Sequence, residues 1–492
     1  MNAIIEIENR VLMSDSYKYS HFSQYQKNVV NMYDYAEARS DEIFGKTVFF
    51  GLQYILKKYF TKPITKEEVN EAQEYSEFHG IPFNKDGWDI IVNECNGYLP
   101  VTIKAIPEGK VVPNKNVLFT IELTEPDKRL FWIVSWLETT LMKVWYSCNI
   151  ATRSYYIKEM LMEYANKTQD NPFVDYTLHN FGDRSSSSIE TAAIGGMSHL
   201  VAFSGTDNFA SIKTAAYYYN VENKMTIGHS IPATEHSTVT SWGKDKEFDM
   251  VNNFIEKFKN SPIIACVADS YDYFNFVNKI TSGDFKTKIE SEGYPIFVIR
   301  PDSGNPEQII PKTLQIMEQN NVEYTTNNKG FKVFNKYRII WGDGINMDSM
   351  KIMLDILVSK GYSTENIAFG MGGALMQGNE NTSNNRDTMG FAIKCSNITL
   401  EERVPTGNSD YSSTIEYVEK EVFKDPKTAQ NKKSKKGKVT TYFNFETNEY
   451  FTDVIGKYKT NGNIIEVLEI VFKNGKMVKE YTFEEVRNNL NT

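Results

Sequence analysis

Histidines are concentrated in the first half of the chain: all six lie before residue 237, and four of them lie between residues 179 and 236. Histidine is well suited to exchange protons or to accept a phosphoryl group near neutral pH. His199 lies in a segment rich in Ala and Gly, where we expect it to pack. His236 lies in a segment with few apolar residues, and the loop from Asp269 to Asp272 could orient its ring. A carboxylate on one imidazole nitrogen makes the other a better nucleophile or base. His236 is therefore a candidate catalytic residue, although its spacing also allows a structural role.

Two further segments carry groups that suit phosphate. Arg300-Pro-Asp302-Ser-Gly304 places a cation and a carboxylate on one loop. The guanidinium group fits a phosphate, and the carboxylate fits Mg²⁺ or a ribose hydroxyl. Gly370-Met-Gly-Gly373 leaves backbone N–H groups accessible to an anion. The chain has no P-loop, no H-E-x-x-H and no G-x-S-x-G element, nor a G-x-G-x-x-G between a strand and a helix. These residues predict an enzyme that handles phosphate.

Short apolar runs in the second half of the chain end in acidic or glycine-rich segments. They cover residues 263–269, 295–302, 338–343 and 366–370, and a helix is expected between the last two, from Asn346 to Gly361. Buried strands that alternate with helices predict βαβ units and a parallel sheet, in which the loops after the strands form the active site. A single acid after a strand could merely cap the next helix. Four such ends in succession favour a site.

The rest of the chain predicts a second, mixed layer. Residues 176–184 are typical of a strand and its exit loop, and Ser187 with Glu190 predicts a capping box for a helix over about residues 188–203. Helices are expected over residues 47–59 and 128–146, and strands over 99–103, 117–121, 440–445 and 465–472. A chain of 492 residues exceeds the size of a single core. We therefore expect an α+β domain over residues 1–150, completed by about 400–492, and an α/β domain with the active site over 151–399.

Composition narrows the class of protein. The net charge of −9 argues against nucleic-acid binding through the overall field. No apolar run approaches the length of a membrane span, no signal peptide is visible, and four scattered cysteines indicate a reducing compartment, so we expect a cytoplasmic protein. Residues 424–438 contain seven lysines, which are typical of a solvated loop but could also contact an anionic substrate.

The order of these motifs resembles one enzyme family. The motifs are Asp15-Ser-Tyr-Lys18, Leu178 to Arg184, Gly205-Thr-Asp207, Ser230 to Thr238, Asp269 to Asp272, Arg300 to Pro306, Gly342-Asp-Gly344 and Lys432 to Gly437. With these motifs the chain closely resembles the nicotinamide phosphoribosyltransferases, from about residue 12 to beyond residue 480. The resemblance implies an incomplete (β/α) barrel of the type II phosphoribosyltransferase kind, with an additional mixed α+β layer from the terminal segments. It also implies a homodimer with shared active sites.

The resemblance further implies a reaction and its participants. Nicotinamide and phosphoribosyl pyrophosphate would give nicotinamide mononucleotide and pyrophosphate, with Mg²⁺ as cofactor and ATP as co-substrate. Phe181 and a partner subunit's Tyr17 would stack on the pyridine ring. Arg184 would contact the carboxamide oxygen and the substrate's phosphates. Asp207 would accept from the carboxamide NH₂ and repel the carboxylate of nicotinate.

The remaining implied roles concern the phosphates and the histidine. His236 matches a histidine that is phosphorylated by ATP, with Glu235 and Asp272 as its supporters, and Asp302 joins them as a catalytic residue. The Mg²⁺ ligands stay unassigned. The other implied substrate-binding residues are Ser230, Arg300, Gly342, Asp343, Gly372, Gly373 and Arg386, with Arg39, Lys394 and Lys424 supplied by the neighbouring subunit.

The sequence departs from the family pattern at three places, and two alternative functions are also possible for it. Ala268 stands where a serine is common, Asp183 replaces an aromatic residue, and the loop after Arg39 is shorter than in animal members. These changes alter the expected affinities for substrates and inhibitors, but they do not alter the expected reaction.

The first alternative function is that of a nicotinate phosphoribosyltransferase. Asp207 argues against it, because an acid that faces the carboxylate of nicotinate is unfavourable. The second is a catalytically idle binding protein, which is disfavoured because charged site residues cost stability when they have no task.

Overall fold

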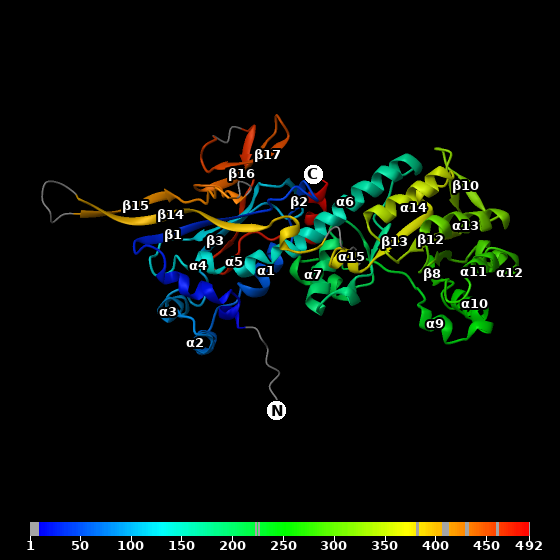
Figure 1. Cartoon of the computed structure of the whole chain (residues 1–492), viewed down its shortest axis with the longest axis horizontal. Helices are drawn as coiled ribbons and strands as arrows, with labels where there is room; N and C mark the ends of the chain where they lie inside the picture. The colour runs from blue at the N-terminus through cyan, green and yellow to red at the C-terminus, as the bar shows by residue number, and fades with distance from the viewer. Residues whose placement is uncertain are drawn as a thin grey trace, which may run out of the picture. The chain divides into compact units, whose positions relative to one another are not determined.

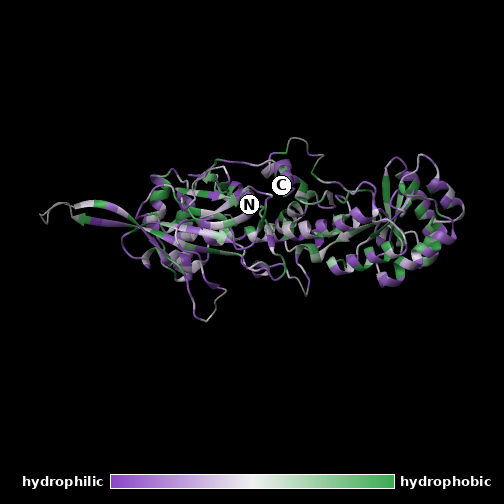
Figure 2. Ribbon diagram, turned by 90° about the horizontal axis from the view of Figure 1, so that it is seen from above, coloured by the Kyte–Doolittle hydropathy of each residue, from purple (hydrophilic) through white to green (hydrophobic). Residues whose placement is uncertain are grey.

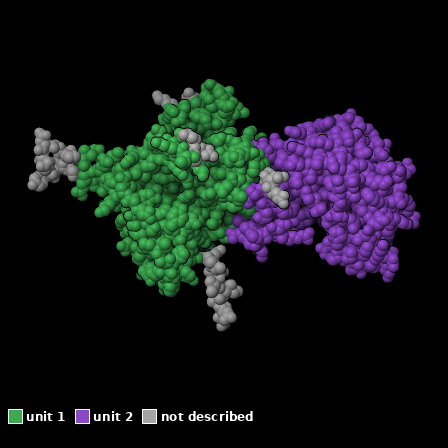
Figure 3. Space-filling model, viewed as in Figure 1, with its two compact units in different colours: residues 1–152, 217–220, 385–492 green, residues 153–216, 221–384 purple. Residues whose placement is uncertain are grey.

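The computed structural model describes residues 9–221, 224, 227–379, 383–405, 413–428, 432–458 and 462–491. The chain forms two compact units (Figure 3). Unit 1 comprises residues 1–152, 217–220 and 385–492, and unit 2 comprises residues 153–216 and 221–384. Within the described ranges, no helix combines the length and the hydropathy needed to cross a bilayer.

Unit 1 is built on a seven-stranded antiparallel sheet that joins both ends of the chain (Figure 1). Every residue of its strand β1 is buried. The strand order is β15 (Ser413–Glu421), β14 (Ala392–Pro405), β1 (Val29–Glu37), β5 (Val117–Leu123), β3 (Val101–Ala105), β19 (Glu469–Lys473) and β20 (Lys476–Met477). Smaller sheets pair β2 (Lys46–Val48) with β4 (Val111–Pro113), and β16 (Val439–Asn444) with β17 (Glu449–Val454) and β18 (Ile464–Glu466).

The helices of unit 1 differ in part from the expected ones. The helix expected from residue 47 begins only at residue 52, because residues 46–48 pair with β4. The helix expected over residues 128–146 is divided into short pieces. The helices are α1 (Leu52–Tyr59), α2 (Lys66–His79), α3 (Lys85–Asn93), α4 (Ile133–Trp136), α5 (Glu138–Met142), α16 (Phe483–Leu490) and the first part of α6 (Val144–Thr168).

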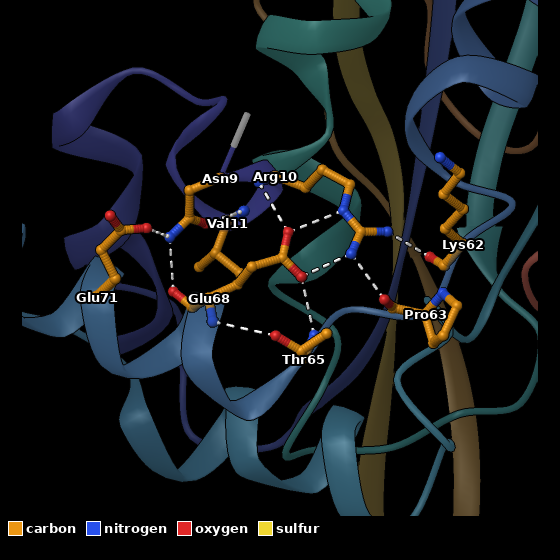
Figure 4. A network of polar contacts seen from close by, with 8 residues as sticks. All are labelled: Asn9, Arg10, Val11, Lys62, Pro63, Thr65, Glu68 and Glu71. Carbon is orange, nitrogen blue, oxygen red and sulfur yellow. Dashed lines mark hydrogen bonds and ion pairs between the residues drawn. The ribbon is translucent and has the colours of Figure 1, made fainter. Parts of the chain in front are cut away.

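An ion-paired network fastens the first described residues to α2 (Figure 4). The Arg10 guanidinium donates to both carboxylate oxygens of Glu68, at 2.8 and 2.6 Å, and to the backbone carbonyls of residues 62 and 63. Glu68 also closes a capping box with Thr65. Burial opposes ionisation of Glu68, but the hydrogen bonds from Arg10 and from the Thr65 backbone outweigh it and hold the pKa of Glu68 below its usual value. The network therefore fixes both the start of α2 and the chain before it.

Strand β1 also buries a carboxyl group, Asp34, one of whose oxygens lacks a hydrogen-bond partner among the described residues. Burial, with a smaller contribution from Glu138, raises the pKa of Asp34 to about 7. In the unfolded chain this carboxyl ionises near pH 4. Between these values the folded state keeps an extra proton, so stability falls as the pH rises through this window.

Asp34→Asn is therefore expected to stabilise the protein at neutral and alkaline pH. The variant should gain on the order of 4 kcal/mol over the wild type between about pH 4 and pH 8, because it has no carboxyl to ionise. Urea unfolding of both proteins across this range measures the gain. A stability difference that does not change with pH would contradict the assignment.

Unit 2 contains the predicted parallel sheet. All its neighbouring strands pair in parallel, and hydrophobic strands run between helices of mixed hydropathy (Figure 2). The strand order is β7 (Gly205–Thr206), β6 (Leu178–Asn180), β13 (Ile367–Met371), β12 (Tyr337–Trp341), β9 (Ile296–Arg300) and β8 (Ile263–Val267), and a separate hairpin joins β10 (Tyr324–Thr326) to β11 (Lys332–Phe334).

Helices connect these strands, and two of them test the predicted caps. Asn346 caps a helix that ends at Ser359, as expected. The capping box expected from Ser187 and Glu190 is instead formed one residue later by Ser188 and Thr191. The helices are α7 (Ile189–His199), α8 (Phe209–Tyr218), α9 (His236–Thr240), α10 (Glu247–Lys257), α11 (Tyr273–Ile280), α12 (Gly283–Glu290), α13 (Pro306–Gln319), α14 (Met347–Ser359) and α15 (Gly373–Met376).

A short segment joins the two edge strands of this sheet. On one side, the backbone N–H of Thr206 in β7 donates to the carbonyl of His229 at 3.0 Å. On the other side, the backbone N–H of Thr234 donates to Ala265 of β8 at 3.0 Å. These contacts are isolated bridges and not a ladder. The sheet is thus an incomplete barrel. Residues 229–234 span the gap between its two edge strands without adding a strand to it.

Candidate active site

The site candidates of unit 2 lie at the carboxyl ends of its strands. Because the strands are parallel, these ends meet at the same edge of the sheet. They carry Phe181 and Arg184 after β6, Asp207 after β7, Asp269 after β8, Arg300 and Asp302 at the end of β9, Gly342 and Asp343 after β12, and Gly372 and Gly373 after β13.

Phe181 packs against the sheet where two glycines leave room for its ring. A Cβ atom on Gly370 would come within 1.9 Å of Phe181 Cε2, and one on Gly342 would come within 3.5 Å of the same atom. The Phe181 backbone N–H donates to the carbonyl of Met371 at 3.0 Å, which fixes the residue over β13. The ring is only partly buried and packs against the small core cluster that includes Ala265. Gly370 therefore makes room for an aromatic platform.

Arg184 is presented to solvent on the turn that follows Phe181. The turn, Asp183–Ser185, is a 3-10 helix, and the N–H of Gly182 just before it donates to the Asn180 side chain at 2.8 Å. Both Asp183 and Arg184 are exposed, and within the described part of the chain neither side chain has an ion-pair partner. The guanidinium group is thus available to an incoming ligand.

Asp207 and Ser230 come together, although they lie on different segments. Ser230 Oγ donates to Asp207 Oδ1 at 2.5 Å, and the Asp207 backbone N–H donates to the Asn180 carbonyl at 3.2 Å. Ser230 belongs to the segment that closes the barrel, so the closure itself places the hydroxyl. Both residues are exposed. The carboxylate is oriented and still able to accept another hydrogen bond.

His236 begins α9, and its ring lies between two carboxylates. Its Nε2 lies 2.9 Å from Asp269 Oδ1, and its Nδ1 lies 4.0 Å from Asp302 Oδ2. Ser303 Oγ donates to the other Asp269 oxygen at 2.5 Å, which fixes the carboxylate. Loops after β8 and β9 therefore orient one histidine from two sides.

The two supporters that the family resemblance implied for His236 have other contacts. Asp272 caps α11 by accepting from the Asn275 N–H at 3.0 Å. Glu235 takes part in the capping box of α9 and accepts from the Ser237 hydroxyl. Asp269 occupies the supporting position instead. From the sequence, Asp269 was expected only as part of the loop 269–272. That loop contains two acids, Asp269 and Asp272, and no local sequence signal shows which of them contacts the histidine.

Arg300 is the last residue of β9, and Asp302 lies in the loop that follows it. Arg300 Nε lies 3.8 Å from Asp302 Oδ1, and it has no hydrogen-bond partner in the described ranges although it is buried. Ser270 Oγ, on the loop after β8, is likewise buried and unpaired there. The Arg300 carbonyl accepts from the Ala268 N–H at 3.0 Å, which joins the two loops. Unsatisfied polar atoms at strand ends are typical of a site that awaits a polar ligand.

The glycine-rich ends of β12 and β13 complete this edge. A Cβ atom on Gly342 would lie 3.3 Å from Asp302 Oδ1, so the glycine leaves space beside that carboxylate. Asp343 is exposed, and its carbonyl accepts from Trp341 Nε1 at 2.7 Å. Gly372 precedes α15 and Gly373 begins it. The glycines expose backbone next to the acids.

Five of the predicted substrate-binding residues lie in unit 1, and their contacts are described within that unit. Arg39 donates to Glu37 at 2.8 Å, and one of its guanidinium nitrogens is buried and unpaired within the described residues. Arg386 pairs with the neighbouring Asp387, and Lys424 is exposed. Tyr17 and Lys394 are the other two, and both are partly exposed.

Comparison with known proteins agrees with this geometry. Two family models match the chain: the nicotinamide phosphoribosyltransferase N-terminal domain over residues 9–103, and the nicotinate phosphoribosyltransferase (NAPRTase) family over residues 176–474. The solved nicotinate-nucleotide pyrophosphorylase of Pyrococcus furiosus superposes with a TM-score of 0.62 at 14% identity, covering 100% of this chain and 97% of that one. Human nicotinic acid phosphoribosyltransferase gives 0.53 at 13% identity, with 98% and 93% covered. These structures confirm the predicted fold.

Relatives found by sequence are more similar to this chain in identity than these two solved structures. A nicotinamide phosphoribosyltransferase of Xanthomonas campestris is 38% identical over 98% of both chains. One of Acinetobacter baylyi is 28% identical, with 97% of this chain and 96% of that one covered. With such identity along nearly its whole length, the chain belongs to the nicotinamide phosphoribosyltransferases, enzymes of the nicotinate phosphoribosyltransferase family.

Proposed function

We propose that this enzyme transfers phosphoribosyl from phosphoribosyl pyrophosphate to nicotinamide in NAD salvage, giving nicotinamide mononucleotide and pyrophosphate. The observation that carries the choice of base is the exposed Asp207 carboxylate, held by Ser230 at the end of β7. A carboxylate accepts a hydrogen bond from the carboxamide NH₂ of nicotinamide. It repels the carboxylate of nicotinate, so it favours nicotinamide by weakening the binding of nicotinate.

The neighbouring groups suit the rest of the base. Phe181 offers one aromatic face, seated over Gly370. Arg184, exposed on the next turn, would donate to the carboxamide oxygen or to a phosphate. The ring nitrogen of nicotinamide would then attack the anomeric carbon as the bond from that carbon to pyrophosphate breaks, and the leaving pyrophosphate takes the electron pair.

The loops after β9 and β12 suit the phosphates and the ribose. Arg300 is the fixed cation, and its unpaired Nε is available to a phosphate oxygen. In the described ranges no three His, Cys, Asp or Glu side chains form a ready metal cage. Mg²⁺ commonly binds one or two carboxylates together with substrate phosphates. Asp302 and Asp343, on neighbouring strand ends, fit that need and would hold it, and the ion would neutralise charge on the leaving pyrophosphate.

His236 is the candidate for ATP coupling. Its Nε2 is held by Asp269, which leaves Nδ1 as the nitrogen able to accept a phosphoryl group. Transfer of the γ-phosphoryl group of ATP to Nδ1 would form a phosphohistidine and release ADP, and later hydrolysis would return the free imidazole. Asp302 lies 4.0 Å from that nitrogen, so phosphorylation adds negative charge beside the loop that we assign to the substrate phosphates.

A homodimer would complete the site with residues of unit 1. We propose that Tyr17, Arg39, Lys394 and Lys424 act on the substrates bound by a second copy, and that Arg386 contacts a phosphate. The hairpin of β14 and β15 exposes Ile415 and Tyr417, each more than half accessible, which suits an interface between copies (Figure 1). We further propose a cytoplasmic location, which the four free cysteines support.

Nicotinate is the second candidate base, because the model matching residues 176–474 and both solved relatives carry its name. Product chromatography separates the two. Purified protein with phosphoribosyl pyrophosphate and Mg²⁺ would receive each base separately, with and without ATP. Mononucleotide mainly from nicotinamide, increased by ATP, is the expected result. Product mainly from nicotinate would overturn the choice of base.

Asp207→Ala tests the source of selectivity. The ratio of kcat/KM for nicotinamide to that for nicotinate should fall at least about tenfold, because both the accepting oxygen and the repulsion are lost. Asp183→Ala is the matched control, since it removes an exposed acid from the same edge and should leave the ratio unchanged. An unchanged ratio in Asp207→Ala would show that another residue selects the base.

A further inference from the structure

The segment that presents Tyr17 is attached to one short stretch of unit 1. Residues 13–18 lie along residues 135–140, where α4 gives way to α5. Thr139 Oγ1 donates to the Asp15 carboxylate at 2.7 Å and accepts from the Asp15 N–H at 3.2 Å. Thr140 Oγ1 donates to the carbonyl of residue 13 at 2.8 Å. This corner therefore sets the path of the Tyr17 segment.

Glu138, at the same corner, contacts two cations with its two carboxylate oxygens. Oε2 accepts from Lys18 Nζ at 2.6 Å, and Oε1 lies 3.9 Å from Lys394 Nζ. The Lys18 side chain is 3% exposed and also donates to the carbonyl of Ser135 at 2.9 Å, so this end of the contact is rigid. The Lys394 side chain is 39% exposed and lies on β14. One carboxylate thus joins an anchored lysine to an accessible one.

The Tyr17 ring depends on this anchoring for its orientation. It is 56% exposed, and its aromatic neighbour among the described residues is the edge-on ring of His21 at 5.0 Å. The ammonium group of Lys18 lies 5.7 Å from the ring centroid. Side-chain packing therefore fixes the ring only weakly, and its position follows the backbone of residues 13–18 and the place of Lys18.

We propose that Glu138 is a positioning residue that holds two substrate-binding groups at once, the Tyr17 segment through Lys18 and the ammonium group of Lys394 directly. The inference rests on the proposed function, in which Tyr17 and Lys394 act on the substrates bound by a second copy, and it adds that the aromatic ring of Tyr17 meets the base while the cation of Lys394 meets a phosphate. Its particular consequence is that one substitution at Glu138 weakens the binding of both substrates. A carboxylate with a merely structural role would change the stability and leave both affinities alone.

Glu138→Gln tests this in the full-length protein, because it keeps the shape of the side chain and removes its charge. The KM values for nicotinamide and for phosphoribosyl pyrophosphate should each rise about five- to tenfold, as expected when a partly buried cation loses its anionic partner. The kcat value should change less than twofold. Titration calorimetry with each substrate gives the affinities without turnover, and the melting temperature reports any loss of folding.

Two further variants separate positioning from general damage. Thr139→Val removes the contact with Asp15 and leaves Glu138 intact, so it should raise the KM for nicotinamide alone. If Glu138→Gln fails to fold, Glu138→Asp replaces it as the test, because it keeps the charge, withdraws it from both Lys18 and Lys394, and should raise both KM values. Asp89→Asn is the matched control, because Asp89 pairs with Lys85 at 2.5 Å on α3 and has no place in the site. It should change neither affinity.

Three results would contradict the proposals, and they can be told apart. A folded Glu138→Gln variant that binds both substrates like the wild type would overturn the inference alone. So would a Thr139→Val variant in which both affinities fall together, because the two substrates would then respond to any disturbance of the corner. A wild-type protein that binds neither nicotinamide nor phosphoribosyl pyrophosphate would overturn the proposed function, and the inference with it.

Discussion

Gly370→Ala is expected to raise the KM for nicotinamide by about 30-fold, the effect of about 2 kcal/mol of overpacking at a single contact. The added methyl group would lie 1.9 Å from Phe181 Cε2, and 2.2 Å from Cδ2, so the ring must leave its position. A displaced ring cannot stack on the base that it is proposed to hold. Steady-state kinetics with nicotinamide as the varied substrate measure the change.

Gly342→Ala is the matched control for this prediction. A methyl group there would lie 3.5 Å from the same ring atom and 3.3 Å from Asp302, contacts that small shifts relieve. Its effect on the KM for nicotinamide should stay within about threefold. A double variant, Gly370→Ala with Phe181→Leu, relieves the clash by shortening the side chain. It should recover the melting temperature and leave the affinity for nicotinamide low. An unchanged KM in folded Gly370→Ala would remove Phe181 from the base-binding role.

The strand ends of unit 2 could be predicted from sequence because their signal is local. Each apolar run ends in an acid or a glycine, as at Asp302 and Asp343, and a run of buried residues specifies a strand without reference to its neighbours. Parallel pairing then brings the ends together at one edge. Such ends predict Arg300, Asp302 and Asp343 in one site, and the structure places them at the ends of the neighbouring strands β9 and β12.

The closure of the barrel could not be predicted in the same way. Residues 229–234 bridge β7 and β8 through single backbone contacts, and they show neither the alternation of a strand nor the periodicity of a helix. The contact between Ser230 and Asp207 depends on that closure. The expected start of α1 was wrong for a similar reason. Residues 47–50, Thr-Val-Phe-Phe, have enough apolar character to extend the helix, but the pairing of residues 46–48 with β4 outweighs this local preference. Non-local contacts decided both cases.

Asp269→Asn is expected to lower the proposed stimulation by ATP at least about tenfold, while Asp272→Asn leaves it nearly unchanged. The first change puts an amide beside His236 Nε2, where a carboxylate now lies at 2.9 Å, so the ring loses the partner that sets its tautomer and stabilises its charged form. The second changes a helix cap, and Asn caps a helix about as well as Asp. The two substitutions alter the same charge on the same loop, only three residues apart.

Two measurements distinguish these variants. The rate with saturating substrates, with and without ATP, gives the stimulation. Transfer of labelled phosphate from the γ-position of ATP to the protein measures the proposed phosphohistidine, with His236→Ala as the blank. Labelling should persist in Asp272→Asn and fall sharply in Asp269→Asn. The opposite pattern would return the supporting role to Asp272, and it would mean that α11 gives up its cap when ATP binds. Because the Asp269 carboxylate is also held by Ser303 at 2.5 Å, Ser303→Ala should reproduce part of the Asp269→Asn effect, whereas nothing at α11 should.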